Sequence, residues 1–155
     1  MLKAYVCVAC EKVIIAKDDV ASLIGLFSKM RMFVPVGTEI PRNAVTPKEW
    51  CVFSIWDIEP GDELKDLILH TKFIYPDGSQ FGDVNKAKII MEPGKRAQML
   101  AIVPGFPIGQ TGDYTVATWV EENERVVAGP IEFKLGLEIV SSPQEVTPSQ
   151  TILAP

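Results

Sequence analysis

Short apolar runs broken by proline and glycine are the feature of this sequence that most limits its fold. The runs are rich in Val, Ile, Phe, Tyr and Trp, which favour strands, and Gly, Pro, Asn and Asp separate them, as in turns. Twelve prolines and eleven glycines in 155 residues interrupt the chain too often for long helices. The pattern predicts an all-β domain with two packed antiparallel sheets, a β-sandwich.

The end of the chain shows the strand pattern most clearly. Tyr114, Val116 and Thr118 alternate onto one face of a strand, and the next strand alternates in the same way. Glu122-Asn123 lies between them as a turn in which Asn tolerates a positive φ, so the two strands form a hairpin. The strands predicted along the whole chain are residues 2–15, 20–28, 31–36, 49–58, 67–75, 86–91, 96–103, 113–121 and 125–137.

The segments outside these strands define the domain organisation. Residues 1–140 read as one β-sandwich domain, and residues 141–155, rich in Ser, Thr, Gln and Pro, as a flexible C-terminal tail. Residues 35–47 contain three prolines and read as a long connection between sheets. Residues 60–69 carry at most a helical turn.

Charge, the N-terminal apolar run and the cysteines bear on partners and location. The formal net charge is −5 and the basic residues are scattered, which argues against a nucleic-acid partner. The apolar run 4–10 is too short for a membrane span, and little precedes it that could serve a secretory signal, so no membrane partner is expected. Three cysteines are an odd number at low density and indicate reduced thiols in a cytoplasmic protein.

Two short stretches resemble known proteins. The run Ser22-Leu23-Ile24-Gly25-Leu26-Phe27 and the turn Tyr75-Pro76-Asp77-Gly78 resemble an uncharacterised family of small bacterial proteins, which implies a β-sandwich without an established activity. Gly112-Asp113-Tyr114 ahead of the last hairpin looks like the end of immunoglobulin-like sandwiches, where a Tyr packs at a corner. The resemblance implies an immunoglobulin-like or related Greek-key arrangement.

Few residues could support catalysis or bind a metal. Cys7, Cys10, Cys51 and His70 would make a Cys₃His zinc set only if the chain turned between Cys7 and Cys10, because residues three apart on a strand point to opposite faces. His70, the single histidine, would be the base of any hydrolytic triad, but no nucleophile elbow occurs and an outward-facing strand residue is the simpler reading. The sequence therefore predicts no catalytic residue, no metal and no cofactor.

Acidic residues in turns offer a calcium site as an alternative to plain solvated turns. Calcium needs six or more converging oxygens, and no single loop has the repeated Asp-x-Asp spacing. The candidates are Asp18, Asp19, Asp57, Asp62, Glu63, Asp77 and Asp113.

Trp50 and Trp56 are the candidate binding residues. They share one face of the strand 49–58, while Cys51 and Phe53 make the other face apolar as well. Two tryptophans on one face could stack sugars or fill a partner's pocket, or they could belong to the core. Both faces of this strand are apolar, and the interior of a sandwich buries only one of them. The other face must be covered either by a partner subunit or by the connection 35–47.

These features predict a non-catalytic interaction or assembly protein that works by contact with protein, including self-association through a sheet edge or face. The alternative is a small-ligand or carbohydrate-binding module using Trp50 and Trp56 as surface tryptophans.

Overall fold

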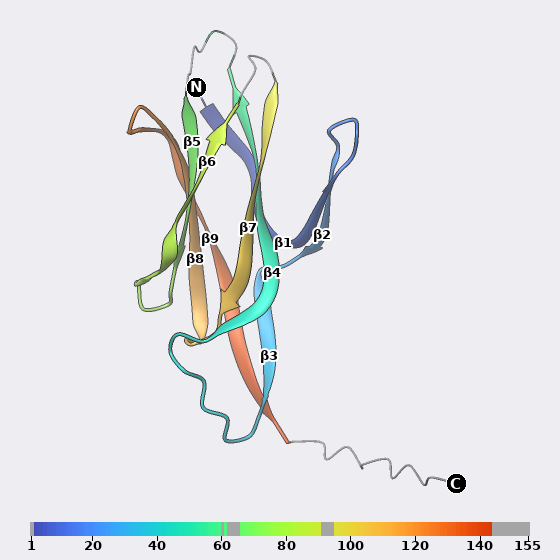
Figure 1. Ribbon diagram of the computed structural model, residues 1–155, viewed down its shortest axis with the longest axis vertical. Helices are drawn as coiled ribbons and strands as arrows, with labels where there is room; N and C mark the ends of the chain where they lie inside the picture. The colour runs from blue at the N-terminus through green and yellow to red at the C-terminus, as the bar shows by residue number, and fades with distance from the viewer. Residues whose placement is uncertain (1, 60, 62–65, 91–94, 144–155) are drawn as a thin grey trace, which may run out of the picture.

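The computed structural model describes residues 2–59, 61, 66–90 and 95–143, and these residues form nine strands in two sheets (Figure 1). The first sheet has the order β2-β1-β4-β7, and the second has the order β3-β9-β8-β5-β6. The predicted β-sandwich is confirmed, and the described residues contain no helix. The strands are β1 (Leu2–Ile15), β2 (Ala21–Leu26), β3 (Lys29–Pro35), β4 (Val45–Ile58), β5 (Leu67–Ile74), β6 (Gln80–Ile89), β7 (Arg96–Pro107), β8 (Gly112–Glu122) and β9 (Arg125–Ser142).

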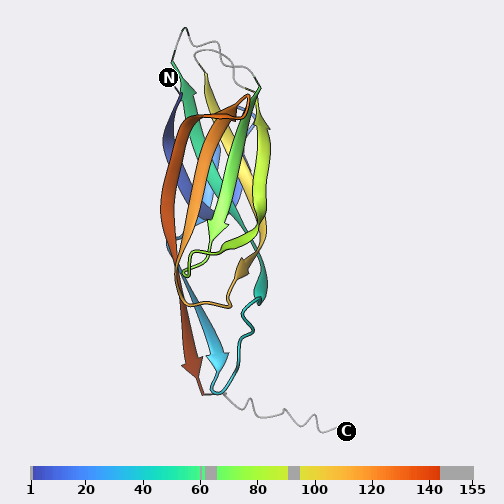
Figure 2. The same ribbon diagram turned by 90° about the vertical axis from the view of Figure 1, so that its left-hand side faces the viewer.

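One strand pair departs from the expected antiparallel arrangement. β3 runs parallel to the end of β9, with Lys29 opposite Gly136 and Pro35 opposite Ser142. Figure 2 looks onto the second sheet and shows β3 and the end of β9 continuing together below the body of the sandwich. This pairing also corrects the predicted start of the tail, because β9 extends to Ser142 rather than ending before residue 141. Residues 144–155 of that predicted tail lie outside the described residues.

The predicted turn between β8 and β9 is present, but it lies one residue later than expected, at Asn123-Glu124 rather than Glu122-Asn123. Asn123 and Glu124 have φ of 49° and 65°, the two positive values that a tight hairpin between β8 and β9 requires. Tyr114 donates a hydrogen bond from its hydroxyl to the carbonyl oxygen of Gln110, at 2.6 Å. The phenol therefore ties the start of β8 to the preceding loop, as the corner motif does.

The main core lies between the sheets and is centred on the inward face of β4. Trp50 makes edge-on or tilted ring contacts with Phe27, Phe73 and Phe106 at centroid distances of 5.3–5.8 Å. Trp56 packs further along the same face in a cluster with Leu2, Leu67 and others. Each indole N–H is satisfied inside the core: Trp50 donates to the Gly105 carbonyl and Trp56 to the Ser54 hydroxyl, both at 2.9 Å.

A third apolar cluster lies on the outward face of the first sheet. Its buried members are Cys10, Cys51 and Phe53, and Val13 and Leu23 are among the side chains that pack against them. The latter two come from the β1–β2 hairpin. The second face of β4 is therefore covered from within the chain by this hairpin, a cover that neither of the two predicted alternatives anticipated.

Several strand boundaries differ from prediction. β6 begins at Gln80 rather than residue 86, and β4 begins at Val45, so the predicted connection 35–47 is shorter. A register irregularity between Thr46 and Glu49 accommodates Pro47, which lacks the N–H that a regular ladder needs. The predicted turn within 60–69 falls largely on residues outside the described ranges.

Candidate functional site

The two predicted binding residues lie inside the protein. Trp50 is 1% exposed and Trp56 is 0% exposed. Neither indole offers a face to a ligand at the surface, so the expectation of a platform of surface tryptophans is corrected: Trp50 and Trp56 are core residues. Alternation along β4 grouped them on one face, but it did not show that this face points toward the second sheet.

The cysteines and the histidine do not come together. Cys7 packs against the main core, whereas Cys10 and Cys51 lie in the cluster on the outward face of the first sheet. His70 is on β5, in the other sheet. Among the described residues, no group of three His, Cys, Asp or Glu side chains is arranged to hold a metal ion.

His70 faces outward from the second sheet, as predicted, yet it is only 4% exposed. Its ring stacks on Trp119 at 5.1 Å, and its Nε2 lies 3.0 Å from Oε2 of Glu121 without hydrogen-bond alignment. Trp119 donates its indole N–H to the other oxygen of Glu121 at 2.8 Å. Among the described residues, the side chains in contact with the imidazole are therefore a carboxylate and an indole, neither of which is the serine or cysteine of a hydrolytic triad.

The acidic turn residues also stay apart. Asp18 lies in the β1–β2 turn, Asp57 near the end of β4 and Asp113 at the start of β8, while Asp62 and Glu63 lie outside the described residues. Converging oxygens are what a calcium site requires, and the described candidates do not supply them.

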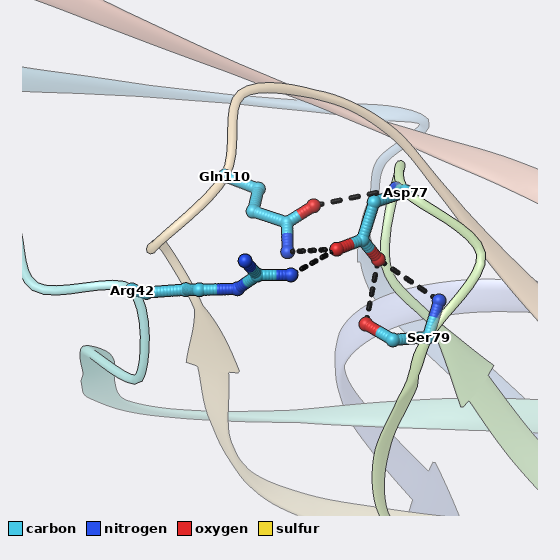
Figure 3. Close-up of polar contacts among 4 residues, drawn as sticks. All are labelled: Arg42, Asp77, Ser79 and Gln110. Atoms are coloured by element: carbon cyan, nitrogen blue, oxygen red, sulfur yellow. Dashed lines mark hydrogen bonds and ion pairs between the residues drawn. The ribbon is translucent and has the colours of Figure 1, made fainter.

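Asp77 holds three connections together at one end of the sandwich (Figure 3). Its Oδ1 accepts hydrogen bonds from the Ser79 backbone N–H at 2.9 Å and the Ser79 hydroxyl at 2.6 Å. Its Oδ2 accepts from Gln110 at 3.0 Å and pairs with Arg42 of the β3–β4 connection. The hydrogen bonds from Ser79, more than the Arg42 charge, lower the pKa of Asp77 to about 2. Gly109 lets the same loops approach, since a Cβ there would lie 1.9 Å from the Arg42 carbonyl oxygen.

We expect Asp77→Asn to lower the melting temperature by a few degrees at pH 7, because the amide cannot accept all these hydrogen bonds. The folded-state pKa is below the ordinary 3.8, so the carboxylate stabilises the fold above about pH 4 and loses that effect as pH falls toward 2. Thermal unfolding followed by circular dichroism between pH 7 and pH 2 measures this difference. Asp83→Asn on β6 is the matched control, and an equal effect of both variants would contradict the assignment.

An open surface depression of about 750 Å³ lies over the starts of β8 and β3 and the second half of β9. Glu138 pairs with both Lys29 and Arg31, and Lys134 donates to the Thr115 hydroxyl. Three of its four charged lining residues, Lys29, Lys134 and Glu138, are thus engaged within the chain, and the depression carries no functional assignment.

The β1–β2 hairpin is the segment whose exposed apolar side chains are least explained by packing within the fold. We call residues 11–26 the hairpin arm: β1 pairs with β4 only as far as Cys10, and beyond it pairs only with β2. At its tip, the Asp19 carbonyl accepts a hydrogen bond at 2.7 Å from Gln98 of β7, so the arm crosses the outward face of the first sheet. The arm exposes five large apolar side chains, with exposed fractions of 46% for Ile14, 51% for Ile15, 55% for Val20, 46% for Ile24 and 62% for Leu26, beside exposed charged residues such as Lys12.

β2 is also the edge strand with the least protection. Charged side chains and prolines on an edge discourage pairing with another chain. The other three edge strands carry such residues, for example Arg31 on β3, Lys86 on β6 and Pro104 on β7. β2 reads Ala-Ser-Leu-Ile-Gly-Leu and contains none. The sequence predicted an interaction through a sheet edge but did not indicate which strand forms it. The absence of charged residues from 20–28 was the signal that could have identified β2.

Comparison with known proteins adds no family assignment to this geometry. No protein-family model matches the sequence, and no curated protein matches it either. None of the described residues forms a helix that could cross a membrane.

Proposed function

We propose that this protein is a non-catalytic interaction protein that assembles by strand addition at the free edge of β2. The single observation that carries the proposal is this charge-free edge strand, which lies in an arm that exposes five large apolar side chains. An added strand would pair with the backbone groups that β2 leaves open on the side away from β1, and its side chains would cover Ile24 and Leu26.

The partner we propose is a second copy of the chain, paired antiparallel through β2 across a twofold axis. Antiparallel pairing places the start of one β2 beside the end of the other. The start follows Asp18 and Asp19 in the turn, and the end precedes Lys29. Lys29 pairs with Glu138 at 3.0 Å within the chain, and Arg31 would keep Glu138 paired, at 2.9 Å, if Lys29 turned to the partner. Opposite charges would therefore meet at both ends of the paired strands, whereas parallel pairing would bring the acidic turns together.

Sedimentation velocity at micromolar to high micromolar concentration tests this function. We expect the wild-type protein to be dimeric, and Ile24→Lys to weaken the dimer at least tenfold, because the substitution places a charge on the paired edge. Ile102→Lys is the matched control: Ile102 is 52% exposed on the other edge strand of the same sheet and should leave the dimer intact. A monomeric wild type at high micromolar concentration, or equal weakening by both variants, would refute the proposal.

A further inference from the structure

Cys10 and Cys51 lie directly opposite each other where β1 leaves β4. They are the last pair in the β1–β4 register, and both side chains belong to the outward cluster under the hairpin arm. The Cα atoms of directly opposed antiparallel residues are about 4.5–5.5 Å apart, within the range of about 4.4–6.8 Å that a disulfide spans. The register therefore places two free thiols at disulfide distance.

The two sulfurs lie at the base of the hairpin arm. The backbone N–H of Lys12 acts to lower the pKa of Cys10, and that of Val13 acts to lower the pKa of Cys51, which places both groups near the sulfurs. Lys12 and Val13 both lie in β1 just beyond its pairing with β4. The thiols thus mark the point about which the arm would move relative to the sheet.

Cys7 is excluded from this pair by the same register. It lies opposite Ser54 and packs against the main core, on the inward side of β1. The nearest cysteine in sequence to Cys10 is therefore on the wrong face, and the partner 41 positions away is on the right one.

We propose that Cys10 and Cys51 form a redox-active dithiol that a small-molecule disulfide, such as oxidised glutathione, converts into a disulfide that locks the base of the hairpin arm. One cysteine thiolate attacks a sulfur of oxidised glutathione, forming a mixed disulfide and releasing one glutathione thiolate. The second cysteine thiolate attacks the cysteine sulfur of the mixed disulfide and releases the second glutathione. The protein loses two electrons and two protons, and the oxidant is reduced to two glutathione molecules.

Burial controls the rate of this exchange. Cys10 is 0% exposed and Cys51 6% exposed, and burial is the main cause that raises the pKa of both thiols. Proximity adds to this for Cys10, because a thiolate at Cys51 would repel a second one. The oxidant reaches the sulfurs only when the arm lifts, so the reaction is slow. It is faster at alkaline pH than at neutral pH, because a larger fraction of each thiol is then the reactive thiolate.

The test is incubation of the folded protein with oxidised glutathione at pH 8, followed by thiol counting and peptide mapping without reductant. We expect two of the three thiols to be lost and the melting temperature to rise by about 5–10 °C, reversibly on reduction, because the new bond closes a loop of about 40 residues. Trypsin leaves Cys7 and Cys10 together in peptide 4–12 and Cys51 in peptide 49–65, so the mapping is repeated on variants.

Cys7→Ser should still link these two peptides, whereas Cys10→Ala should not. Retention of all three thiols in the wild-type protein, or a linkage that survives in Cys10→Ala and is lost in Cys7→Ser, would overturn the proposal. Circular dichroism of each variant before oxidation shows that it is folded. Because the readout is a covalent bond within one chain, the outcome is independent of whether β2 pairs with a second copy.

Discussion

Replacing Trp56 with alanine should lower the free energy of unfolding by about 3–5 kcal/mol. The indole is 0% exposed, and removing it leaves a cavity between the sheets. The substitution also removes the indole N–H that donates a hydrogen bond to the hydroxyl of Ser54, a residue that is only 2% exposed. Urea unfolding should show a lower midpoint with an unchanged slope.

Trp56→Phe is the matched control for this prediction. Phenylalanine retains most of the apolar volume and loses the N–H, so its cost should be well below that of alanine. A loss under about 1 kcal/mol for Trp56→Ala would mean that the side chain is not in the core, and would return it to consideration as a surface binding residue.

Phe53→Ala should also destabilise the protein by about 3–5 kcal/mol, although Phe53 points away from the second sheet. The phenyl ring is 1% exposed because the hairpin arm and its neighbours cover it. The prediction therefore tests whether the outward cluster is a core within one chain. Equilibrium unfolding at low micromolar and high micromolar protein concentration is the measurement.

Phe33→Ala provides the control, since Phe33 is 64% exposed on β3 and its removal should change stability by less than about 0.5 kcal/mol. If a partner subunit rather than the arm covered Phe53, the cost of Phe53→Ala would depend on protein concentration. A concentration-dependent loss would contradict the intramolecular cover.

Particular elements show how far the sequence could predict this fold. The hairpin of β8 and β9 was predictable because Tyr114, Val116 and Thr118 alternate strictly and Asn123 permits the turn. The start of β6 was not, since Gly82 has a positive φ of 62° and interrupts the alternation that reveals a strand. The parallel pairing of β3 with β9 joins segments about 100 residues apart, a distance over which local pattern carries no information.

The positions of the candidate site residues were likewise predictable only in part. Alternation correctly separated Cys7 from Cys10, because the faces of a strand follow from its period of two. It also grouped Trp50 with Trp56 on β4. It did not predict that this face meets the second sheet, or that Cys51 would lie opposite Cys10, because both depend on which strand pairs with which.

The sequence by itself determined the class of structure, the approximate strands and the two apolar faces of β4, since each follows from local propensity and period. Only the tertiary structure decided what covers each face. The second sheet buries Trp50 and Trp56, and the hairpin arm buries Phe53. The same choice left β2 as an uncharged edge, because strand order, and with it exposure, depends on contacts between residues far apart in the chain.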